Sequence, residues 1–362
     1  MTENEERHEK AVELFRDDKF GEALDIFLKL NELLPKELDK KILFENISHC
    51  YANMGEFEKA DEFYEKAIGT VEDSIWSKYL NAILLFKRAK FIDSINELEA
   101  IPSSYMDKYN NAEKNYWLGK NYYYLDDYEK SNIYFEKSYL IYDKDEDPEG
   151  YAQLIYEYGS VLDELGEEDT AFKFYCELDD YIRFLNQTNR LSLYYCRSLK
   201  RKEKGEIRKA LSDVLKSHDI GRDLYHCDQE DINMRLILMA RLYREVFEYE
   251  NALNSLNKIE FPLSDDYDYW HYYRNYSIAH YELGNYEDAI KHMEKFIEAH
   301  KIKQLFPIEE FHQFKLKMAD AYFKTSDFEK AMNLYKELLD SNLASADDYI
   351  LIKDRLNVIE SS

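Results

Sequence analysis

Small and apolar residues recur along the chain at a period of 34 to 42 residues. Each period contains a turn residue, usually aromatic, followed three positions later by Ala or Ser. The nine pairs are Phe20/Ala23, Phe57/Ala60, Phe91/Ser94, Tyr128/Ser131, Glu168/Ala171, Ile207/Ala210, Tyr249/Ala252, Tyr286/Ala289 and Phe328/Ala331. A repeat of this length is typical of proteins that stack one supersecondary unit on the next.

A second column of small residues lies nine positions before each turn residue. It consists of Ala11, Ser48, Ala82, Gly119, Gly159, Ser198, Ala240, Ser277 and Ala319. Between the two columns, as in residues 44–68 and 115–138, the apolar residues follow helical spacing. A small residue in the middle of a helix lets a second backbone approach closely. The pattern therefore predicts nine helical hairpins with one small residue in each helix.

Turn and break signals agree with this division. Four glycines fall at the same place between the two helices of a hairpin, where a positive φ costs glycine nothing. They are Gly55, Gly166, Gly205 and Gly284. Every proline falls between hairpins, where a helix must end. The prolines are Pro35, Pro102, Pro148, Pro262 and Pro307.

These features resemble those of the tetratricopeptide repeat family. The features in common are the small residue of the first helix, the Gly-aromatic turn, the Ala of the second helix and the Pro after that helix. Residues 272–290 and 318–331 carry the resemblance most closely, and it extends from about residue 5 to about residue 341. It implies an all-α, right-handed superhelical solenoid of about nine hairpins, forming one continuous domain over residues 1–362. Because most spacings exceed the family's usual 34 residues, we expect longer helices or connections around 217–231 and 299–308.

The two ends of the solenoid carry different signals. Residues Ser345 to Asp348 form a capping box, which predicts a helix over residues 345–362. Its apolar stripe, expected to close the last hairpin, consists of Tyr349, Ile352, Leu356 and Ile359. At the other end, the acidic residues Glu3, Glu5 and Glu6 are expected to begin the first helix directly.

Charge restricts the possible partners. The 48 Lys and Arg residues against 74 Asp and Glu residues give a formal net charge of −26. Such a charge opposes binding to nucleic acid and to anionic lipid. No apolar run is long enough to span a membrane, the acidic N-terminus does not resemble a secretion signal, and the four cysteines are widely spaced. We expect a cytoplasmic protein that is a monomer or a weak oligomer.

No motif of an enzyme or a metal site is present in the sequence. There is no Gly-rich phosphate loop and no nucleophile motif, and the pairs of acidic residues fall in predicted turns. Residues 143–149 loosely resemble a calcium loop but lack its central glycine and closing Glu. We therefore expect no catalytic residue, no bound metal and no cofactor.

The resemblance also implies a binding surface, because in this family the first helices of the hairpins line a concave groove. Projected on this chain, hairpins three to five contribute aromatic residues, namely Trp76, Tyr79, Phe86, Tyr116, Trp117, Tyr123, Tyr124 and Tyr156. Hairpins seven to nine contribute mostly basic residues, namely Arg241, Arg244, His271, Arg274, Asn275, Lys317 and Lys324. Aromatic residues and Arg dominate binding hot spots, although some of these aromatics are alternatively core fillers. The expected partner is a protein or peptide segment with apolar or aromatic anchors and acidic groups.

One basic run, residues 199–209, lies in the sixth hairpin. Lys200, Arg201 and Lys202 are expected near the C-terminus of a helix, where cations are favoured. We interpret the run as a solvated helix end, and the alternative is a docking patch for an acidic partner.

Three functions are compatible with this pattern. The first, which we favour, is a non-enzymatic adaptor that binds a peptide segment in the groove. The second resembles bacterial peptide-pheromone receptors and Rap-type proteins. Those proteins carry an N-terminal helical bundle or a DNA-binding helix-turn-helix, for which a first hairpin starting near residue 5 leaves no room. The third is a structural subunit that acts through its convex face.

Overall fold

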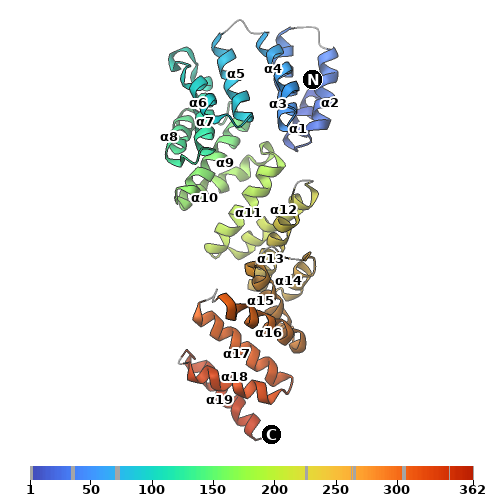
Figure 1. Cartoon of the computed structure of the whole chain (residues 1–362), viewed down its shortest axis with the longest axis vertical. Helices are drawn as coiled ribbons and strands as arrows, with labels where there is room; N and C mark the ends of the chain where they lie inside the picture. The colour runs from blue at the N-terminus through green and yellow to red at the C-terminus, as the bar shows by residue number, and fades with distance from the viewer. Residues whose placement is uncertain are drawn as a thin grey trace. The chain divides into compact units, whose positions relative to one another are not determined.

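Paired antiparallel helices account for most of the chain in its computed structural model (Figure 1). The structure describes residues 3–33, 37–69, 74–224, 227–261, 263, 266–303, 307–341 and 343–361. The side chains of residues 37–39, 41, 74, 76–77, 266–267 and 299–303 also lie outside the description. The described residues contain no β-strand, in agreement with the expected all-α class.

The chain forms two compact units, Met1–Leu193 and Tyr194–Ser362. The helices that begin in unit 1 are α1 (Glu3–Arg16), α2 (Phe20–Leu33), α3 (Glu37–Asn53), α4 (Phe57–Gly69), α5 (Ser74–Lys87), α6 (Phe91–Glu99), α7 (Lys108–Tyr123), α8 (Tyr128–Ile141), α9 (Pro148–Glu164), α10 (Glu168–Glu177) and α11 (Gln187–Glu203). Three 3₁₀ helices are inserted, namely η1 (Ser103–Tyr105), η2 (Leu178–Asp180) and η3 (Ile182–Phe184).

Unit 2 takes up most of α11 and continues with helices of similar length. They are α12 (Ile207–Asp223), α13 (Gln229–Glu245), α14 (Tyr249–Leu256), α15 (Asp266–Glu282), α16 (Tyr286–Lys303), α17 (Ile308–Lys324), α18 (Phe328–Asp340) and α19 (Ala346–Glu360). The prediction that all of residues 1–362 form one continuous solenoid stays a prediction.

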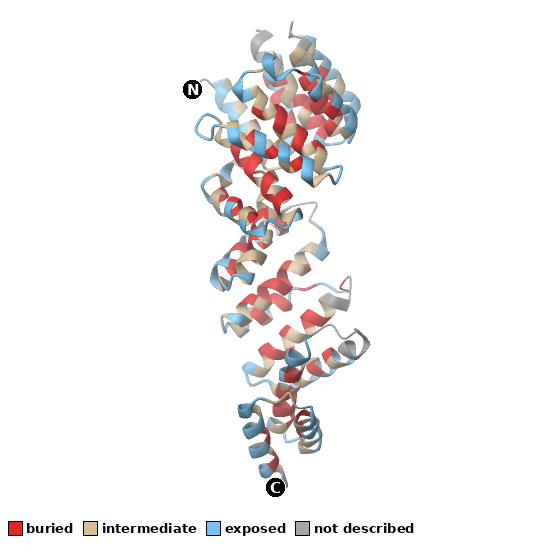
Figure 2. Cartoon of the chain, turned by 90° about the vertical axis from the view of Figure 1, so that its left-hand side faces the viewer, coloured by how far each residue is buried: buried red, intermediate tan, exposed pale blue. Residues whose placement is uncertain are grey.

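The repeat pattern read from the sequence is confirmed in both units. Each of the nine predicted turn residues is the first residue of an even-numbered helix, from Phe20 in α2 to Phe328 in α18. All members of the two small columns are buried, and buried residues recur in helix after helix (Figure 2). The small residues lie where the two helices of a hairpin touch, as helix packing requires.

The contacts around the small columns explain their composition. In three hairpins a serine hydroxyl of one column donates a hydrogen bond to a carbonyl of the other, for example from Ser131 Oγ to the Gly119 oxygen at 2.8 Å. A Cβ added at Gly119 would lie 2.9 Å from the Phe135 ring, and one added at Gly159 would lie 2.7 Å from the Tyr175 ring. No larger residue fits at either glycine unless the aromatic ring moves.

The tight turns share one conformation whatever residue they contain. Gly55, Gly166, Gly205 and Gly284 have φ between 74° and 81°, as predicted. In the other five hairpins the same place, two residues before the second helix, is left-handed without glycine. Those residues are Asp18, Ala89, Asp126, Phe247 and Ser326. Non-glycine residues rarely adopt this conformation, so the close approach of the two helices determines the turn.

The extra length of the repeats lies partly in the helices. The second helices α12 and α16 have 17 and 18 residues and extend into the two segments where additional length was expected. Other second helices are short, with 9 residues in α6 and 8 in α14, and irregular segments or 3₁₀ helices complete their repeats. Periodicity gives the length of a repeat but not its division between helix and connection.

Helix α19 closes the last hairpin. The predicted capping box is present, since Ser345 Oγ accepts a hydrogen bond from the Asp348 amide and the Asp348 carboxylate accepts one from the Ser345 amide. Ile352 and Leu356 are buried in the core of unit 2. The assignment of Tyr349 to the buried stripe is wrong, because its side chain is 52% exposed at the first turn of the helix.

Candidate functional site: two clusters on the first helices

Five of the predicted aromatic residues form one cluster on α5 and α7 of unit 1, which we call the inner aromatic cluster. Its members are Phe86, Tyr116, Trp117, Tyr123 and Tyr124. The Phe86 ring centroid lies 5.3 Å from those of both Trp117 and Tyr124 in edge-on geometry. Tyr116 contacts Trp117 at 5.5 Å, and Tyr123 contacts Tyr124 at 5.6 Å. Such ring pairs contribute about 0.5–1.5 kcal/mol beyond their buried area, so the cluster is a preformed apolar surface.

A buried cation lies against this cluster. Lys120 Nζ is 5.4 Å from the Phe86 centroid, 5.6 Å from that of Trp117, and 2.7 Å from Glu157 Oε1 on α9. Burial alone would lower the pKa of Lys120, but the Glu157 carboxylate overcomes it and raises this pKa above its usual value. For Lys87, by contrast, burial and the nearby Lys120 charge lower the pKa to about 8.

Tyr79, another of the predicted aromatic residues, lies in the core below the cluster and contacts Trp117. Tyr79 is buried in the core between α5 and α7, where its hydroxyl donates to Glu113 Oε2 at 2.9 Å. It therefore offers no surface to a partner. Phe86 is also buried, under the other rings of its cluster. Tyr156 is half-buried on α9, and the side chain of Trp76 lies outside the described residues.

In unit 2 the predicted basic residues converge. Burial and the charges of four cations on α11, α13 and α15 lower the pKa of His271 to about 4. The four, which we call the basic cluster, are Lys202, Arg241, Arg244 and Arg274. Two of them are neutralised locally. Arg274 Nη2 lies 2.8 Å from Glu310 Oε2, and Arg241 Nε lies 3.2 Å from Glu245 Oε1.

Arg244 differs from Arg241 and Arg274 because the charge of the nearby Glu245 acts on it only from a distance, without an ion pair among the described residues. Among the described residues no ion pair is formed by Arg244, and its buried Nε has no hydrogen-bond acceptor. Burial, followed by the charge of Arg274, lowers the pKa of Arg244 to about 10. Removing a guanidinium from water without a partner is costly.

A pocket of about 300 Å³ opens beside this guanidinium. Arg244, Arg274 and Lys317 supply its cations, and Ile278 and Phe314 supply its apolar wall. The remaining lining residues are Glu309, Glu310 and Gln313. The pocket therefore combines an unpaired cation, a wall for a short apolar group and carboxylates that already engage some of the cations.

The other predicted basic-zone residues have different roles. Asn275 is 1% exposed and donates its side-chain amide to the His271 carbonyl, so neither Asn275 nor the buried His271 presents a surface. Lys317 pairs with Glu282 at 2.6 Å at the edge of the pocket. Lys324 is exposed at the end of α17, away from the residues that line the pocket.

The basic run 199–209 is not uniformly solvated, which corrects our interpretation of it. Arg201 Nη1 lies 2.6 Å from Asp213 Oδ2, and Arg197 binds the same carboxylate through two nitrogens at 2.8 and 2.9 Å. Both Arg197 and Asp213 are 1% exposed. Lys202 belongs to the basic cluster, and only the later part of the run, such as Arg208, is fully solvated.

The described residues contain no group of three or more His, Cys, Asp or Glu side chains arranged to hold a metal ion. In the same part of the chain, no helix combines the length and the apolar character needed to cross a membrane.

Two segments of the chain match family models, and both models are described as tetratricopeptide repeat. The matches cover residues 43–70, in α3 and α4 of unit 1, and residues 315–342, in α17 and α18 of unit 2. Each match contains one complete set of the columns found throughout the chain, such as Ala319, Phe328 and Ala331. The chain is a tetratricopeptide repeat protein. As such it is a scaffold for protein interactions. No curated protein matches it significantly.

Solved structures of tetratricopeptide repeat and Rap proteins are similar to this chain at low sequence identity and with TM-scores below 0.5. The C-terminal part of a repeat-containing protein from Cytophaga hutchinsonii is 18% identical, with a TM-score of 0.41, over 75% of this chain and 98% of that one. The apo form of RapI is 13% identical, with a TM-score of 0.46, over 94% and 97%. A Rap protein in complex with competence and sporulation factor is 14% identical, with a TM-score of 0.40, over 98% and 99%.

Three charged members of these two surfaces were not predicted from the sequence. Lys120 and Glu157 complete the aromatic surface, and Lys202 completes the basic one. A usable signal was present for Lys120, because it is four residues after Tyr116 on the same helix and so shares its face. No such signal exists for the pairing of Arg274 with Glu310, which depends on how successive repeats stack.

Proposed function

We propose that the chain is a non-enzymatic adaptor whose first helices bind a protein or peptide segment, with a carboxylate of that segment on Arg244. The observation that carries the proposal is the half-buried Arg244 guanidinium, which forms no ion pair with a described residue and lies beside an open pocket. A carboxylate can accept two parallel hydrogen bonds from Arg, including one from Nε. A bound acidic group would therefore provide the acceptor that Nε lacks in the free protein.

The neighbours of Arg244 favour a carboxylate over a neutral group. Arg274 and Lys317 add positive charge, while Ile278 and Phe314 can contact the apolar part of the same residue. The net charge of −26 opposes an acidic segment at long range. Within about 8–10 Å, a Debye length at moderate salt, the local cations dominate.

The inner aromatic cluster is proposed as a second contact surface, for apolar or aromatic anchors of a partner. Tyr124 is 52% exposed, and the rings of Phe91 and Phe86 hold it in place from below at 5.3 Å each. A rigid aromatic surface contributes contact area with little loss of side-chain entropy on binding.

Three further expectations belong to this proposal. The adaptor acts without a cofactor, it works in the cytoplasm, and it is a monomer or a weak oligomer. Its charge also limits its partners to proteins or peptides rather than nucleic acid or membranes. The structural-subunit hypothesis would take its place if only the convex face proved essential.

The proposal is tested with a library of displayed peptides with free C-termini, selected on the full-length chain. Selected peptides should contain Asp, Glu or a required C-terminal carboxylate. Arg244→Glu should weaken their binding at least tenfold, which corresponds to about 1.4 kcal/mol. Binding is measured by calorimetry on the purified variants.

Arg208→Glu is the matched control, because Arg208 is 77% exposed in the same unit and lies outside the pocket. It should leave the affinity within twofold of the wild-type value. Selected peptides without any carboxylate requirement, or unchanged binding by the Arg244→Glu variant, would contradict the proposal.

A further inference from the structure

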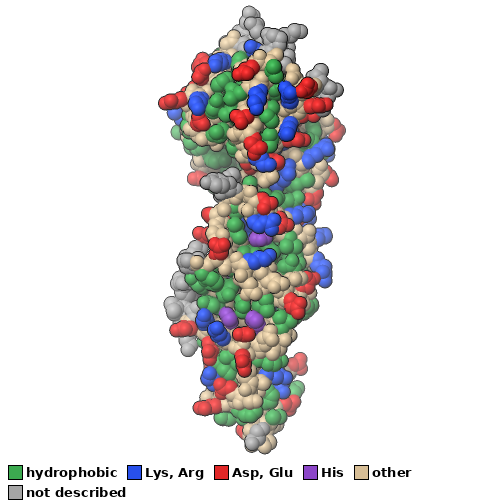
Figure 3. Space-filling model, turned by 90° about the vertical axis from the view of Figure 1, so that its right-hand side faces the viewer, with side chains coloured by type: hydrophobic (Ala, Val, Ile, Leu, Met, Phe, Trp, Pro, Cys, Tyr) green, Lys and Arg blue, Asp and Glu red, His purple; other side chains and the backbone are tan. Residues whose placement is uncertain are grey.

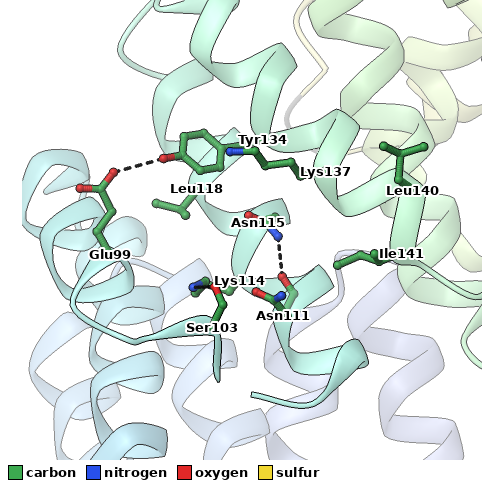
Figure 4. A pocket seen from close by; sticks show the side chains of 10 residues that line it. All are labelled: Glu99, Ser103, Asn111, Lys114, Asn115, Leu118, Tyr134, Lys137, Leu140 and Ile141. Carbon is green, nitrogen blue, oxygen red and sulfur yellow. Dashed lines mark hydrogen bonds between the residues drawn. The ribbon is translucent and has the colours of Figure 1, made fainter. Parts of the chain in front are cut away.

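A cavity of about 630 Å³ lies in hairpins three and four of unit 1, away from the inner aromatic cluster. Its floor is made by α7 and its walls by η1, the end of α6 and α8 (Figure 4). The ten lining residues are Glu99, Ser103, Asn111, Lys114, Asn115, Leu118, Tyr134, Lys137, Leu140 and Ile141. At 100° per residue, the α7 residues of this cavity and those of the aromatic cluster project from opposite sides of the helix.

The floor of the cavity carries a buried lysine, Lys114, at a position that is apolar in the next hairpin. Lys114 lies five residues before the small residue Gly119, and it is 6% exposed. The residue at the same position in the next hairpin is Leu154, which is fully buried. Leu43, Leu193 and Phe314 are buried at this position in three other hairpins, whereas the seventh hairpin has Arg235. A buried lysine lowers stability unless its ammonium group is hydrogen-bonded or paired with an anion.

The ammonium group of Lys114 is only partly satisfied. Nζ donates to the Ile101 carbonyl at 3.0 Å and to Ser103 Oγ at 2.9 Å. It has three donors, and among the described residues no carboxylate pairs with it. Burial lowers its pKa, the charge of Glu99 partly offsets this effect, and the nearby Lys137 lowers the pKa further. One donor therefore remains for a group that enters the cavity.

The neighbours of Lys114 define the charge that the cavity can accept. Lys137 adds a second ammonium, held over the Tyr134 ring at 4.7 Å. The one lining carboxylate, Glu99, already accepts the Tyr134 hydroxyl at 3.3 Å. The charges of these three ionisable groups sum to one excess positive charge. The carboxamide oxygen of Asn111 is buried and unpaired, and it offers an acceptor.

The cavity also has an apolar side. Figure 4 shows Leu140 and Ile141 on the right of the cavity and Lys114 and Ser103 on the left, with Asn111 between them. Leu140 is 74% exposed, so its side chain is accessible to a ligand at the rim of the cavity. Small-molecule sites typically have volumes of about 300–1,000 Å³ and combine an apolar surface with a few fixed polar groups.

We infer that this cavity binds a small organic monoanion, a carboxylate with a short aliphatic chain. The carboxylate would accept the free donor of Lys114 and a hydrogen bond from Lys137, while the aliphatic chain would lie against Leu140 and Ile141. This site is separate from the proposed peptide contacts, and either can exist without the other.

The test measures thermal unfolding of the full-length chain with straight-chain carboxylates from butanoate to octanoate. At least one of them should raise the melting temperature with saturation, because a ligand that binds only the folded state stabilises it. Hexylammonium, with the opposite charge and a similar chain, should not. Lys114→Met should weaken the apparent affinity at least tenfold, while Lys108→Met, on the exposed start of the same helix, should not change it.

A second pair of variants tests the rim of the cavity and leaves Lys114 on its floor unchanged. Leu140→Trp places a large ring at the exposed rim and should weaken binding, whereas Ile133→Trp, exposed on the same helix outside the cavity, should not. The inference is overturned if no carboxylate stabilises the wild-type chain. Equal stabilisation of the Lys114→Met variant, or equal stabilisation by hexylammonium, would overturn it as well.

Discussion

The two units use the same helical positions for opposite chemistry. Four residues after the small residue of the first helix, unit 1 has Phe86 and Tyr123, whereas unit 2 has Lys202 and Arg244. Three residues before the small residue, unit 1 has Tyr116 and Tyr156. The eighth hairpin, in unit 2, has Arg274 at this position, three residues before Ser277. In these hairpins the same side of the first helix is therefore aromatic in unit 1 and basic in unit 2, although the last two hairpins of unit 2 have Tyr281 and Phe323 there.

This comparison shows that the fold determines the residue type at only a few positions of each repeat. Packing requires the small residues and the left-handed turn, and both units satisfy these conditions with the same geometry. The exposed side of the first helix is free to vary. In unit 1 the Lys120–Glu157 pair neutralises the charge within the surface, whereas in unit 2 Arg244 forms no ion pair with any residue that the structure describes. Figure 3 shows acidic and basic side chains interspersed over one face, so this contrast is local.

Removal of the cap should produce the largest difference between the units. A chain that ends at residue 344 loses the contacts of Ile352 and Leu356, and with them about 3–6 kcal/mol of hydrophobic stabilisation of unit 2. Hydrogen exchange should show lost protection in α17 and α18 but not in α1 to α4. Unchanged protection in α17 and α18 would mean that α19 is not a cap.

The buried ion network should be the next most sensitive feature. Unit 2 buries Arg197 next to Ser198, where unit 1 has Leu118 next to Gly119. Asp213→Ala leaves two guanidinium groups without their shared carboxylate and should cost about 3–5 kcal/mol in urea unfolding. Asp219→Ala, at an exposed position of the same helix, should cost less than about 0.5 kcal/mol. Similar values for the two variants would exclude a structural role for the network.

Helix contact in unit 1 is tested by the glycines. Gly119→Leu drives a side chain into the Phe135 ring and should lower the free energy of unfolding by about 1–3 kcal/mol or more. Gly21→Leu is the control, because no other atom lies within 4 Å of a Cβ at Gly21, and this substitution should be neutral or stabilising. Equal destabilisation by both would show that side-chain size, rather than helix contact, limits these positions.

A smaller effect is expected from acid. His49 in unit 1 and His271 in unit 2 both have a pKa lowered to about 4, by burial first and nearby cations second. Between pH 6.5 and 4 the unfolded chain binds protons at these residues while the folded chain does not, so stability falls as pH falls. His49→Gln and His271→Gln should each flatten the slope of stability against pH in this window. A slope unchanged by both would show that neither histidine is neutral in the folded chain.

The sequence was sufficient for the hairpins because their determinants are local. Ala11, Ser48 and their equivalents must be small wherever helices touch, and Phe20 and its equivalents mark the turn. The binding surface was only partly predictable from the sequence. Tyr79 and Asn275 follow the same helical spacing as the groove residues, but contacts with neighbouring helices bury both side chains. Whether an arginine such as Arg241, Arg274 or Arg244 finds an ion-pair partner depends on how the repeats stack. The sequence of a single repeat does not determine this stacking.

The most direct test of the central claim is the stability of Arg244→Met in the absence of any partner. If the Arg244 charge is buried without compensation, its replacement by an apolar chain should raise the free energy of unfolding in urea by about 1 kcal/mol or more. Arg241→Met, which breaks the half-exposed pair with Glu245, should change it by less than about 1 kcal/mol. A Met variant at position 244 that is less stable than the wild-type chain would contradict the account, because it would show that the fold itself uses this guanidinium.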